Sequence, residues 1–306
     1  MKKFKYISNL TLDEIENNIV IPCIDENGNH SIIIKNATTK IVSNKYITDN
    51  LLVQIDTQLF IDNDVYYCHI ISANKKDMYS LGQFYIIYEY IFKKIEEPIG
   101  GSNLSALITS LEDYFKITPD PNLFSLQVGV FGELITIKYL YDSGYHNIIN
   151  KFHNNFYSKH DVELDDKNRI EIKTTVSEKR IHRFKHNQIY RKDVNVYIAS
   201  VMLEESKEGL SLYELFQKVL ELYSDADNIF GLNKLMKRCN VNEENKGLTI
   251  SFEKALNDFR IFDANTLPKI NIDIPDGVSN VTYDVDCSLS EYINIDTFAK
   301  MLHFYF

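Results

Sequence analysis

Four side chains between Glu133 and Lys173 combine the residue types that a metal-dependent hydrolysis of phosphate esters needs. Glu133 lies in a helix-like run, LQVGVFGELITIKYLY, Asp161 in a short strand-like run, HDVEL, and both Glu171 and Lys173 in a second strand-like run, RIEIKTTV. Carboxylates and a backbone carbonyl, here that of Ile172, offer the hard oxygen ligands that Mg²⁺ prefers. A lysine beside them can orient a water molecule and stabilise developing negative charge.

The strand around Glu171 is predicted to have one polar face. Side chains alternate along a strand, so Ile170, Ile172 and Thr174 share the core-facing side. Glu171 and Lys173 then project together from the other side, about 6–7 Å apart. The tripeptide alone is not specific, because the same acid-x-Lys spacing recurs elsewhere in the chain. Its other occurrences are 165–167, 205–207 and 244–246.

The pairing of the two strand-like runs decides whether Asp161 joins this face. Residues 165–168 (DDKN) form a turn signal, which predicts an antiparallel hairpin. A loop with an odd number of residues places Asp161 opposite Glu171 or Lys173, with Cβ atoms about 5 Å apart. An even loop without a bulge would place Asp161 opposite Ile172 and scatter the site. The metal-site hypothesis therefore predicts an odd loop or a β-bulge.

Glu133 falls at the edge of the apolar arc of its predicted helix. A carboxylate that faces a core is costly unless it is paired or liganded. Two interpretations stay open from this element alone: a carboxylate of the site, or a boundary glutamate that reaches solvent. Gly129 and Gly132 each cost a helix about 1 kcal/mol relative to Ala, so we expect them to permit close approach to a sheet.

The segment 177–192 is basic in an otherwise acidic chain. Its six Lys and Arg residues stand against one Glu, a local charge of +5 where the whole chain carries −10. Such a segment is a candidate for phosphate contacts, although a solvated charged face is the alternative. The candidate nucleic-acid-binding residues are Lys179, Arg180, Arg183, Lys185, Arg191 and Lys192. His160, next to Asp161, could touch a metal or a phosphate, but a surface histidine is the expectation.

Composition places the chain among ordinary globular proteins. It has 306 residues, 44% of them apolar and 25% charged, which fits about two domains. Four cysteines without metal-ligand spacing read as reduced thiols. No run reaches about 18 consecutive apolar residues, so we expect no membrane span and a cytoplasmic location.

Pattern changes along the chain predict three parts. Residues 1–98 form a β-rich domain with strands at 30–36, 51–57 and 65–73 and a trailing helix over 78–95. Residues 99–204 form the core that carries the site, with a buried central strand at 194–203. Residues 205–306 form a mixed α/β region, whose first helix opens with a capping box at Ser211 and Glu214. The stretch 98–102 (PIGGS) is the predicted linker between the first two parts.

These residues resemble the PD-(D/E)XK superfamily, and more closely the PD-(D/E)XK motif proteins encoded beside methyltransferases and ATPases in bacterial defence and restriction loci. The resemblance runs nearly the full length and rests on the motifs at 129–134, 160–161, 171–175, 183 and 188. It implies an α/β (α+β) fold with a restriction-endonuclease-like core, a mixed sheet flanked by helices. His160 stands where the superfamily's name has Pro.

The resemblance also implies roles for individual residues. Asp161 and Glu171 would be metal ligands, Lys173 the catalytic lysine, Glu133 the helix carboxylate that completes the site, and Gln188 a polar residue on the following helix.

The residues therefore predict a Mg²⁺- or Mn²⁺-dependent endonuclease that cleaves double-stranded DNA, and the resemblance implies that it belongs to a bacterial restriction or anti-phage system. Methyltransferase or ATPase subunits and a second copy of the chain are its expected partners. Two alternatives stay open. One is a DNA-binding or scaffold subunit with an inactive or partner-dependent site, and the other is RNA cleavage.

Overall fold

The chain forms two compact units. The structure is a computed structural model that describes residues 5–39, 44–47, 51–61, 64–73, 80–151 and 160–301. Unit 1 comprises Met1–Ile117 and Asp225–Lys234, and unit 2 comprises Thr118–Ser224 and Leu235–Phe306. Helices and several sheets alternate along the chain, so the predicted mixed α/β class is confirmed.

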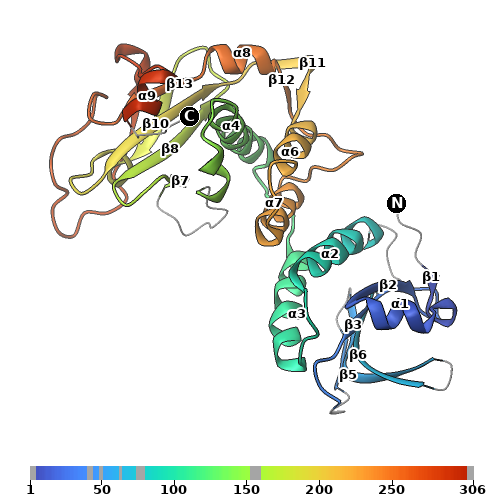
Figure 1. The fold of residues 1–306 in the computed structure, drawn as a ribbon. Coiled ribbons are helices and arrows are strands. Elements are labelled where there is room, and N and C mark those ends of the chain that lie inside the picture. Colours follow the sequence, from blue (N-terminus) through green and yellow to red (C-terminus); the bar gives the residue numbers. More distant parts are fainter. Residues whose placement is uncertain are drawn as a thin grey trace. The chain divides into compact units, whose positions relative to one another are not determined.

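Unit 1 is built on a six-stranded sheet of order β1-β2-β3-β6-β5-β4 (Figure 1). β1 and β2 run parallel, and the other neighbours are antiparallel. The three predicted strands of this region are present as β3, β5 and β6. The strands are β1 (Lys5–Tyr6), β2 (Val20–Ile24), β3 (His30–Lys35), β4 (Asn44–Ile47), β5 (Leu51–Ile61) and β6 (Asp64–Ala73). The helices are η1 (Ile7–Asn9), α1 (Leu12–Asn17), α2 (Ser80–Lys94) and α3 (Gly101–Lys116).

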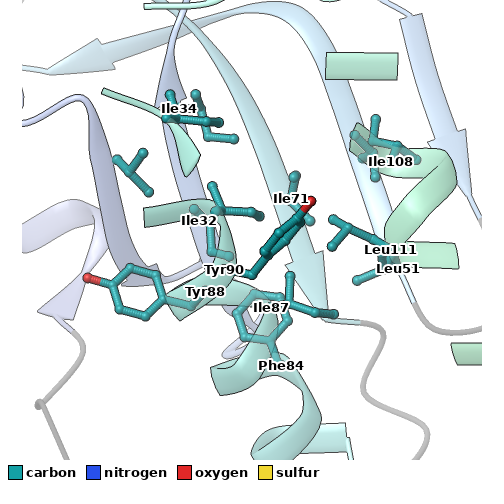
Figure 2. Close-up of a cluster of buried hydrophobic side chains, with 14 of the residues drawn as sticks. Ile32, Ile34, Leu51, Ile71, Phe84, Ile87, Tyr88, Tyr90, Ile108 and Leu111 are labelled. Carbon is teal, nitrogen blue, oxygen red and sulfur yellow. The ribbon is translucent and has the colours of Figure 1, made fainter. Parts of the chain in front are cut away.

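The core of unit 1 lies between this sheet and helices α2 and α3. Alternate strand residues such as Ile32 and Ile71 point to one face, where they meet Phe84 and Ile87 of α2 and Leu111 of α3 (Figure 2). The opposite face carries a second cluster that α1 covers through Ile15. The period-2 pattern of the strands and the aromatic face of α2 thus both serve packing.

The division between the units differs from the predicted boundary at 98–99. Ile99 bridges to Asn36, the residue after β3, and Gly101 begins α3 instead of serving as a linker. α3 then buries Leu104 and Leu111 in the core of unit 1, so unit 1 continues to Ile117. A Pro-Gly pattern signals a chain reversal but does not reveal whether the next helix packs back on the same sheet.

The start of α7 (Ala226–Arg238) also belongs to unit 1, far along the sequence from the rest of that unit. Phe230 stacks on Tyr90 with ring centroids 4.2 Å apart, and the Tyr90 hydroxyl donates to Asp227 at 3.0 Å. Such a return of the chain has no signal in local sequence.

Unit 2 is built on a four-stranded mixed sheet of order β13-β10-β8-β7. β8 and β10 are parallel neighbours, whereas β7 and β13 pair antiparallel at the two edges. β10 is internal and almost wholly buried, as predicted for 194–203. The strands are β7 (Val162–Glu163), β8 (Asn168–Thr175), β10 (Asn195–Met202) and β13 (Arg260–Asp263).

Two short ribbons and several helices complete unit 2. The ribbon of β9 (Ile181–Lys185) and β14 (Thr282–Asp286) packs on the main sheet through Phe184 and Val285. The second ribbon pairs β11 (Glu205–Ser211) with β12 (Thr249–Ile250). The remaining elements are α4 (Leu123–Asp142), η2 (His146–Asn150), α5 (His186–Ile189), α6 (Leu212–Leu220), α8 (Phe252–Asn257), η3 (Cys287–Leu289) and α9 (Ile295–Met301). The predicted capping box of Ser211 and Glu214 opens α6.

Helix α4 lies against β8 and β10, on the sheet face that bears Thr174 (Figure 1). A Cβ at Gly132 would stand 1.8 Å from Thr174 Oγ1, so only glycine permits this approach, as predicted. Gly129 has nothing within 4 Å of such a Cβ, so the same expectation was wrong for that residue. By length and composition α4 could span a membrane, but most of it is buried in unit 2, as in the core helix of a folded domain.

Candidate active site

The hairpin of β7 and β8 has the register that the metal-site hypothesis requires. Val162 lies opposite Ile170 and Glu163 opposite Arg169. The Leu164 N–H donates to Asn168 O at 3.0 Å, which leaves an odd loop of residues 165–167. Continued by one position, this register sets Asp161 opposite Glu171. The odd-loop prediction is confirmed.

Asp161 is held at the edge of β8 by a main-chain hydrogen bond. Its Oδ2 accepts from the backbone N–H of Ile172 at 2.6 Å. The N–H and C=O of one strand residue point to the same side of the strand. The Ile172 carbonyl therefore faces the edge where the Asp161 carboxylate lies.

Glu171 is buried, with 3% of its surface exposed. Its Oε1 lies 2.8 Å from Lys173 Nζ and accepts from Gln188 Nε2 at 2.6 Å. Its Oε2 has no hydrogen-bond donor in the part of the chain that the structure describes, and His160 Nδ1 lies 3.4 Å from it. A buried carboxylate oxygen without a donor is costly, so this atom is available to a cation.

His160 is buried rather than exposed at the surface, contrary to the expectation from sequence. Only 4% of its surface is accessible, and its ring lies beside Glu171. The neighbourhood of Asp161 pointed to a possible contact with the site, but its burial could not be predicted, because a single polar residue before a two-residue strand has no alternation pattern to follow.

Gln188 joins the site from α5. Its amide oxygen accepts from the Lys185 backbone N–H at 2.9 Å, which closes the first turn of this helix, while its Nε2 donates to Glu171. The same oxygen lies 3.4 Å from Lys173 Nζ. The Lys173 ammonium also lies over the ring of Phe184, 5.3 Å from its centroid. Glu171, Lys173 and Gln188 thus form one connected group.

The pKa values of Glu133, on α4, and of Asp161 are raised, in part by the negative charge of this group. Burial raises the pKa of Glu133 to about 8, and the charges of Asp161 and Glu171 act in the same direction. Burial likewise raises the pKa of Asp161 to about 7, with the Glu171 charge adding to the shift. The carboxylates therefore repel one another, and a bound cation would relieve the repulsion.

These residues fit a divalent cation, although they do not form a finished coordination shell. Among the described residues, no three His, Cys, Asp or Glu side chains are already gathered as metal ligands. Lys173 and Gln188 bind one oxygen of Glu171, and the other oxygen is left without a donor. The donor set of Asp161, Glu171 and the Ile172 carbonyl consists of the hard oxygens that Mg²⁺ or Mn²⁺ takes.

Arg180 does not belong to the predicted nucleic-acid surface. It is 9% exposed, and its guanidinium donates to Ser200 O and Oγ and to Asp258 O. These three acceptors come from distant parts of the chain, so a count of local charge could not reveal that this arginine points inward.

Three further basic residues of the segment are paired with carboxylates. Arg183 forms a two-bond contact with Asp284, at 2.9 and 3.1 Å. Arg191 pairs with Asp193 at 2.5 Å and Lys192 with Asp273 at 2.6 Å. Lys179 and Lys185 are exposed. The outward charge of the segment is therefore smaller than its composition suggests.

Two buried polar residues near Lys173 were not predicted from sequence. His182 and Ser200 are 3% and 0% exposed, and His182 Nε2 lies 2.6 Å from Ser200 Oγ. The alternation of β9, in which Ile181, Arg183 and Lys185 are exposed, could have identified His182 as an inward residue. Ser200 lies in a run of apolar residues, where a single hydroxyl does not indicate a functional role.

Comparison with known families agrees with this geometry. The family model described as "Putative PD-(D/E)XK family member, (DUF4420)" matches residues 5–288. No curated protein and no solved structure matches the chain. The match spans both units and includes the β7–β8 hairpin, α4 and α5. With its Glu171-Ile172-Lys173 strand and the acidic residues around it, the chain belongs to the DUF4420 family of PD-(D/E)XK proteins.

Proposed function

We propose that this protein is a Mg²⁺- or Mn²⁺-dependent endonuclease that hydrolyses phosphodiester bonds in double-stranded DNA. One observation carries the proposal: the hairpin register aligns Asp161 with Glu171, and Lys173 bonds the Glu171 carboxylate from the same strand face. Family membership supports a nuclease-like protein at a coarser level.

Each residue of the group would have a distinct task. Asp161, Glu171 and the Ile172 carbonyl would hold the metal, which supplies charge neutralisation and an activated water when bound. Lys173 would orient the attacking water and stabilise negative charge on the phosphate. Gln188 would fix the Glu171 carboxylate, and Glu133 would add negative charge to the site from α4.

DNA would contact the outer face of the β9–β14 ribbon. Arg183 and Lys185 are exposed on β9, and Lys179 precedes it. β9 is the next strand after β8, which would carry the catalytic residues. A two-stranded ribbon such as β9–β14 also fits the major groove of DNA. Lys192 and Arg191 lie just past α5 and would extend the same surface, whereas Arg180 is excluded by its burial.

Cleavage of supercoiled plasmid tests the proposal. The wild-type protein with Mg²⁺ or Mn²⁺ should produce nicked and linear DNA, and EDTA should stop the reaction. Glu171→Ala and Lys173→Ala should abolish cleavage without unfolding unit 2. Glu163→Ala is the matched control, because this glutamate lies on the same hairpin but is partly exposed and contacts Arg169. Activity in Glu171→Ala would refute the assignment.

A second candidate function is a DNA-binding or scaffold subunit whose site is inactive or needs a partner. It is favoured by the absence, among the described residues, of a preassembled metal-ligand group, and by the bonds that already occupy Glu171 Oε1. Such a subunit should bind DNA without cleaving it and need bind no metal.

The remaining alternative is RNA cleavage. Substituting RNA for the plasmid in the same assay tests it.

The biological setting is proposed on the resemblance alone. A role in restriction or anti-phage defence, with methyltransferase or ATPase subunits, predicts that expression of the protein with its neighbouring genes lowers phage plating. Cutting both strands would take two sites, so we propose a homodimer on DNA. Light scattering with and without a DNA duplex measures this directly.

A further inference from the structure

Arg180 is a buried cation bound to neutral acceptors. Its guanidinium donates to Ser200 O at 3.0 Å, Ser200 Oγ at 2.8 Å and Asp258 O at 2.6 Å. Burying a charge without a hydrogen-bonded carboxylate is costly, and arginine stays protonated even so. A fixed positive charge therefore stands inside unit 2, against β10.

Ser200 connects Arg180 to His182 by hydrogen bonds. The Ser200 hydroxyl accepts from Arg180 and has one proton to donate, and His182 Nε2 lies 2.6 Å away. Burial and the charges of Arg180 and Lys173 lower the pKa of His182 to about 4, so the ring is neutral and can accept. The three side chains form a single chain of hydrogen bonds from Arg180 to His182.

This chain of bonds lies directly beside Lys173. β8 and β10 are parallel, and Lys173 is paired with Ser200 in their register. Paired residues of adjacent strands project from the same face, so the Lys173 stem lies next to the Ser200 hydroxyl. Its ammonium is directed to Glu171 Oε1, 2.8 Å away, and lies over the Phe184 ring.

Electrostatics explains that direction. The Arg180 guanidinium cannot lose its proton, so its positive charge disfavours the Lys173 ammonium on the side of Ser200 and His182. The Ser200 hydroxyl is engaged by Arg180 and His182, and His182 is neutral. The favourable position left to the ammonium is at the carboxylate of Glu171.

We propose that Arg180, Ser200 and His182 are positioning residues that hold the Lys173 ammonium against Glu171, in the place from which it would act on a phosphate. The catalytic use of this arrangement rests on the proposed nuclease function, whereas the arrangement itself does not. It assigns the buried arginine of the basic segment to the active site rather than to DNA.

A spectroscopic test reads the Lys173 position without any cleavage. Reductive methylation with ¹³C-labelled formaldehyde places methyl groups on lysine Nζ atoms. Those on Lys173 lie over the Phe184 ring, so their proton signal should be shifted upfield by the ring current. Loss of the signal in Lys173→Arg assigns it. In Ser200→Ala and Arg180→Met the signal should move to the position of exposed lysines.

Ser72→Ala is the matched control for loss of a buried hydroxyl. Ser72 is 3% exposed and bonded to Ser31 in unit 1, at 2.7 Å. This variant should keep the shifted Lys173 signal. If Arg180→Met does not fold, Ser200→Ala alone decides, because it removes the hydroxyl to which both Arg180 and His182 are bonded. An unshifted signal in the wild type, or a signal unchanged by Ser200→Ala, would overturn the proposal.

Kinetics adds a second readout. In plasmid cleavage, Ser200→Ala should lower kcat about 100-fold, since a misplacement of about 1 Å costs that much, while KM for DNA stays within about threefold. If the wild type cleaves nothing, the proposed function fails while the methyl signal still tests the positioning. A rise in KM at constant kcat would instead assign these residues to DNA binding and contradict the inference.

Discussion

Asp161 Oδ2 accepts a hydrogen bond of 2.6 Å from the backbone N–H of Ile172, the residue between Glu171 and Lys173. β7 pairs with β8 at Val162 and Glu163, and at the next position the Asp161 side chain supplies the acceptor that a strand would otherwise provide. The strand that carries Glu171 and Lys173 thereby fixes the Asp161 carboxylate at its own edge. Asp161 is thereby brought next to Glu171, Ile172 and Lys173.

Lys173→Ala should destabilise the metal-free protein and make it dependent on a divalent cation. Glu171 is buried, and loss of its cationic partner at 2.8 Å leaves an uncompensated carboxylate. Breaking such a pair costs about 3 kcal/mol. Urea unfolding in EDTA measures the loss, and Mn²⁺ should restore part of it.

The control for this prediction is Lys254→Ala, which removes an ion pair to Glu204 whose partners are 52% and 57% exposed. An exposed pair contributes at most about 1 kcal/mol. Equal effects of the two substitutions would show that the Glu171–Lys173 pair is not buried in solution.

Stability without metal should fall as the pH rises through 8. The pKa of Glu133 is about 8 in the folded protein and near 4.5 when unfolded. Between these values the folded state binds more protons than the unfolded state, so its advantage is present at low pH and lost above pH 8. From pH 5.5 to 8.5 the wild type should lose at least about 1 kcal/mol more than Glu133→Gln.

Glu214→Gln provides the opposite case for the same measurement. The backbone N–H of Ser211 lowers the pKa of Glu214 to about 2, with further help from the Ser211 hydroxyl and Lys246. Its contribution is lost only as the pH falls below about 4.5. This variant should therefore follow the pH slope of the wild type between 5.5 and 8.5. A Glu133→Gln curve parallel to both would contradict the raised pKa of Glu133.

Two glycines of α4 should respond to alanine with opposite signs. Gly132→Ala would push a methyl group into Thr174, with contacts of 1.8–3.0 Å, and should cost about 1–3 kcal/mol. Gly129→Ala meets no atom within 4 Å and should gain up to about 1 kcal/mol from helix propensity. Thermal unfolding compares them, and Thr174→Ala should relieve part of the Gly132→Ala loss. Similar effects at both positions would contradict the packing of α4 on β8.

The β7–β8 hairpin was more predictable than its surroundings. Alternation along RIEIKTTV and the turn at 165–168 depend on neighbours in sequence, so the faces of β8 and the hairpin register could be read directly. The burial of Arg180 and His160 could not be predicted, because it depends on residues that are distant in sequence, such as Asp258, whose carbonyl accepts from Arg180. The unit boundary failed for the same reason: only tertiary packing shows that α3 and the start of α7 belong with the first sheet.

The ion pair of Arg183 and Asp284 should affect how strongly DNA affinity depends on salt. Their two hydrogen bonds join exposed side chains, so Asp284 partly neutralises an outward charge on β9. Asp284→Asn should steepen the dependence of log affinity on log salt by up to about 1, and Arg183→Ala should flatten it by a similar amount. Fluorescence anisotropy at several salt concentrations measures both slopes. Unchanged slopes in both variants would remove this ribbon from the DNA surface.

Calorimetric titration with Mn²⁺ tests the central claim most directly, because it asks whether the carboxylates around β8 hold a metal before any substrate is considered. The wild-type protein should bind Mn²⁺, and Asp161→Asn and Glu171→Gln should each lower the affinity at least about tenfold, since each removes one charged ligand. Glu163→Gln, on the same hairpin, should bind as the wild type does. No binding by the wild type, or binding of Mn²⁺ by Asp161→Asn and Glu171→Gln with the wild-type affinity, would contradict the account.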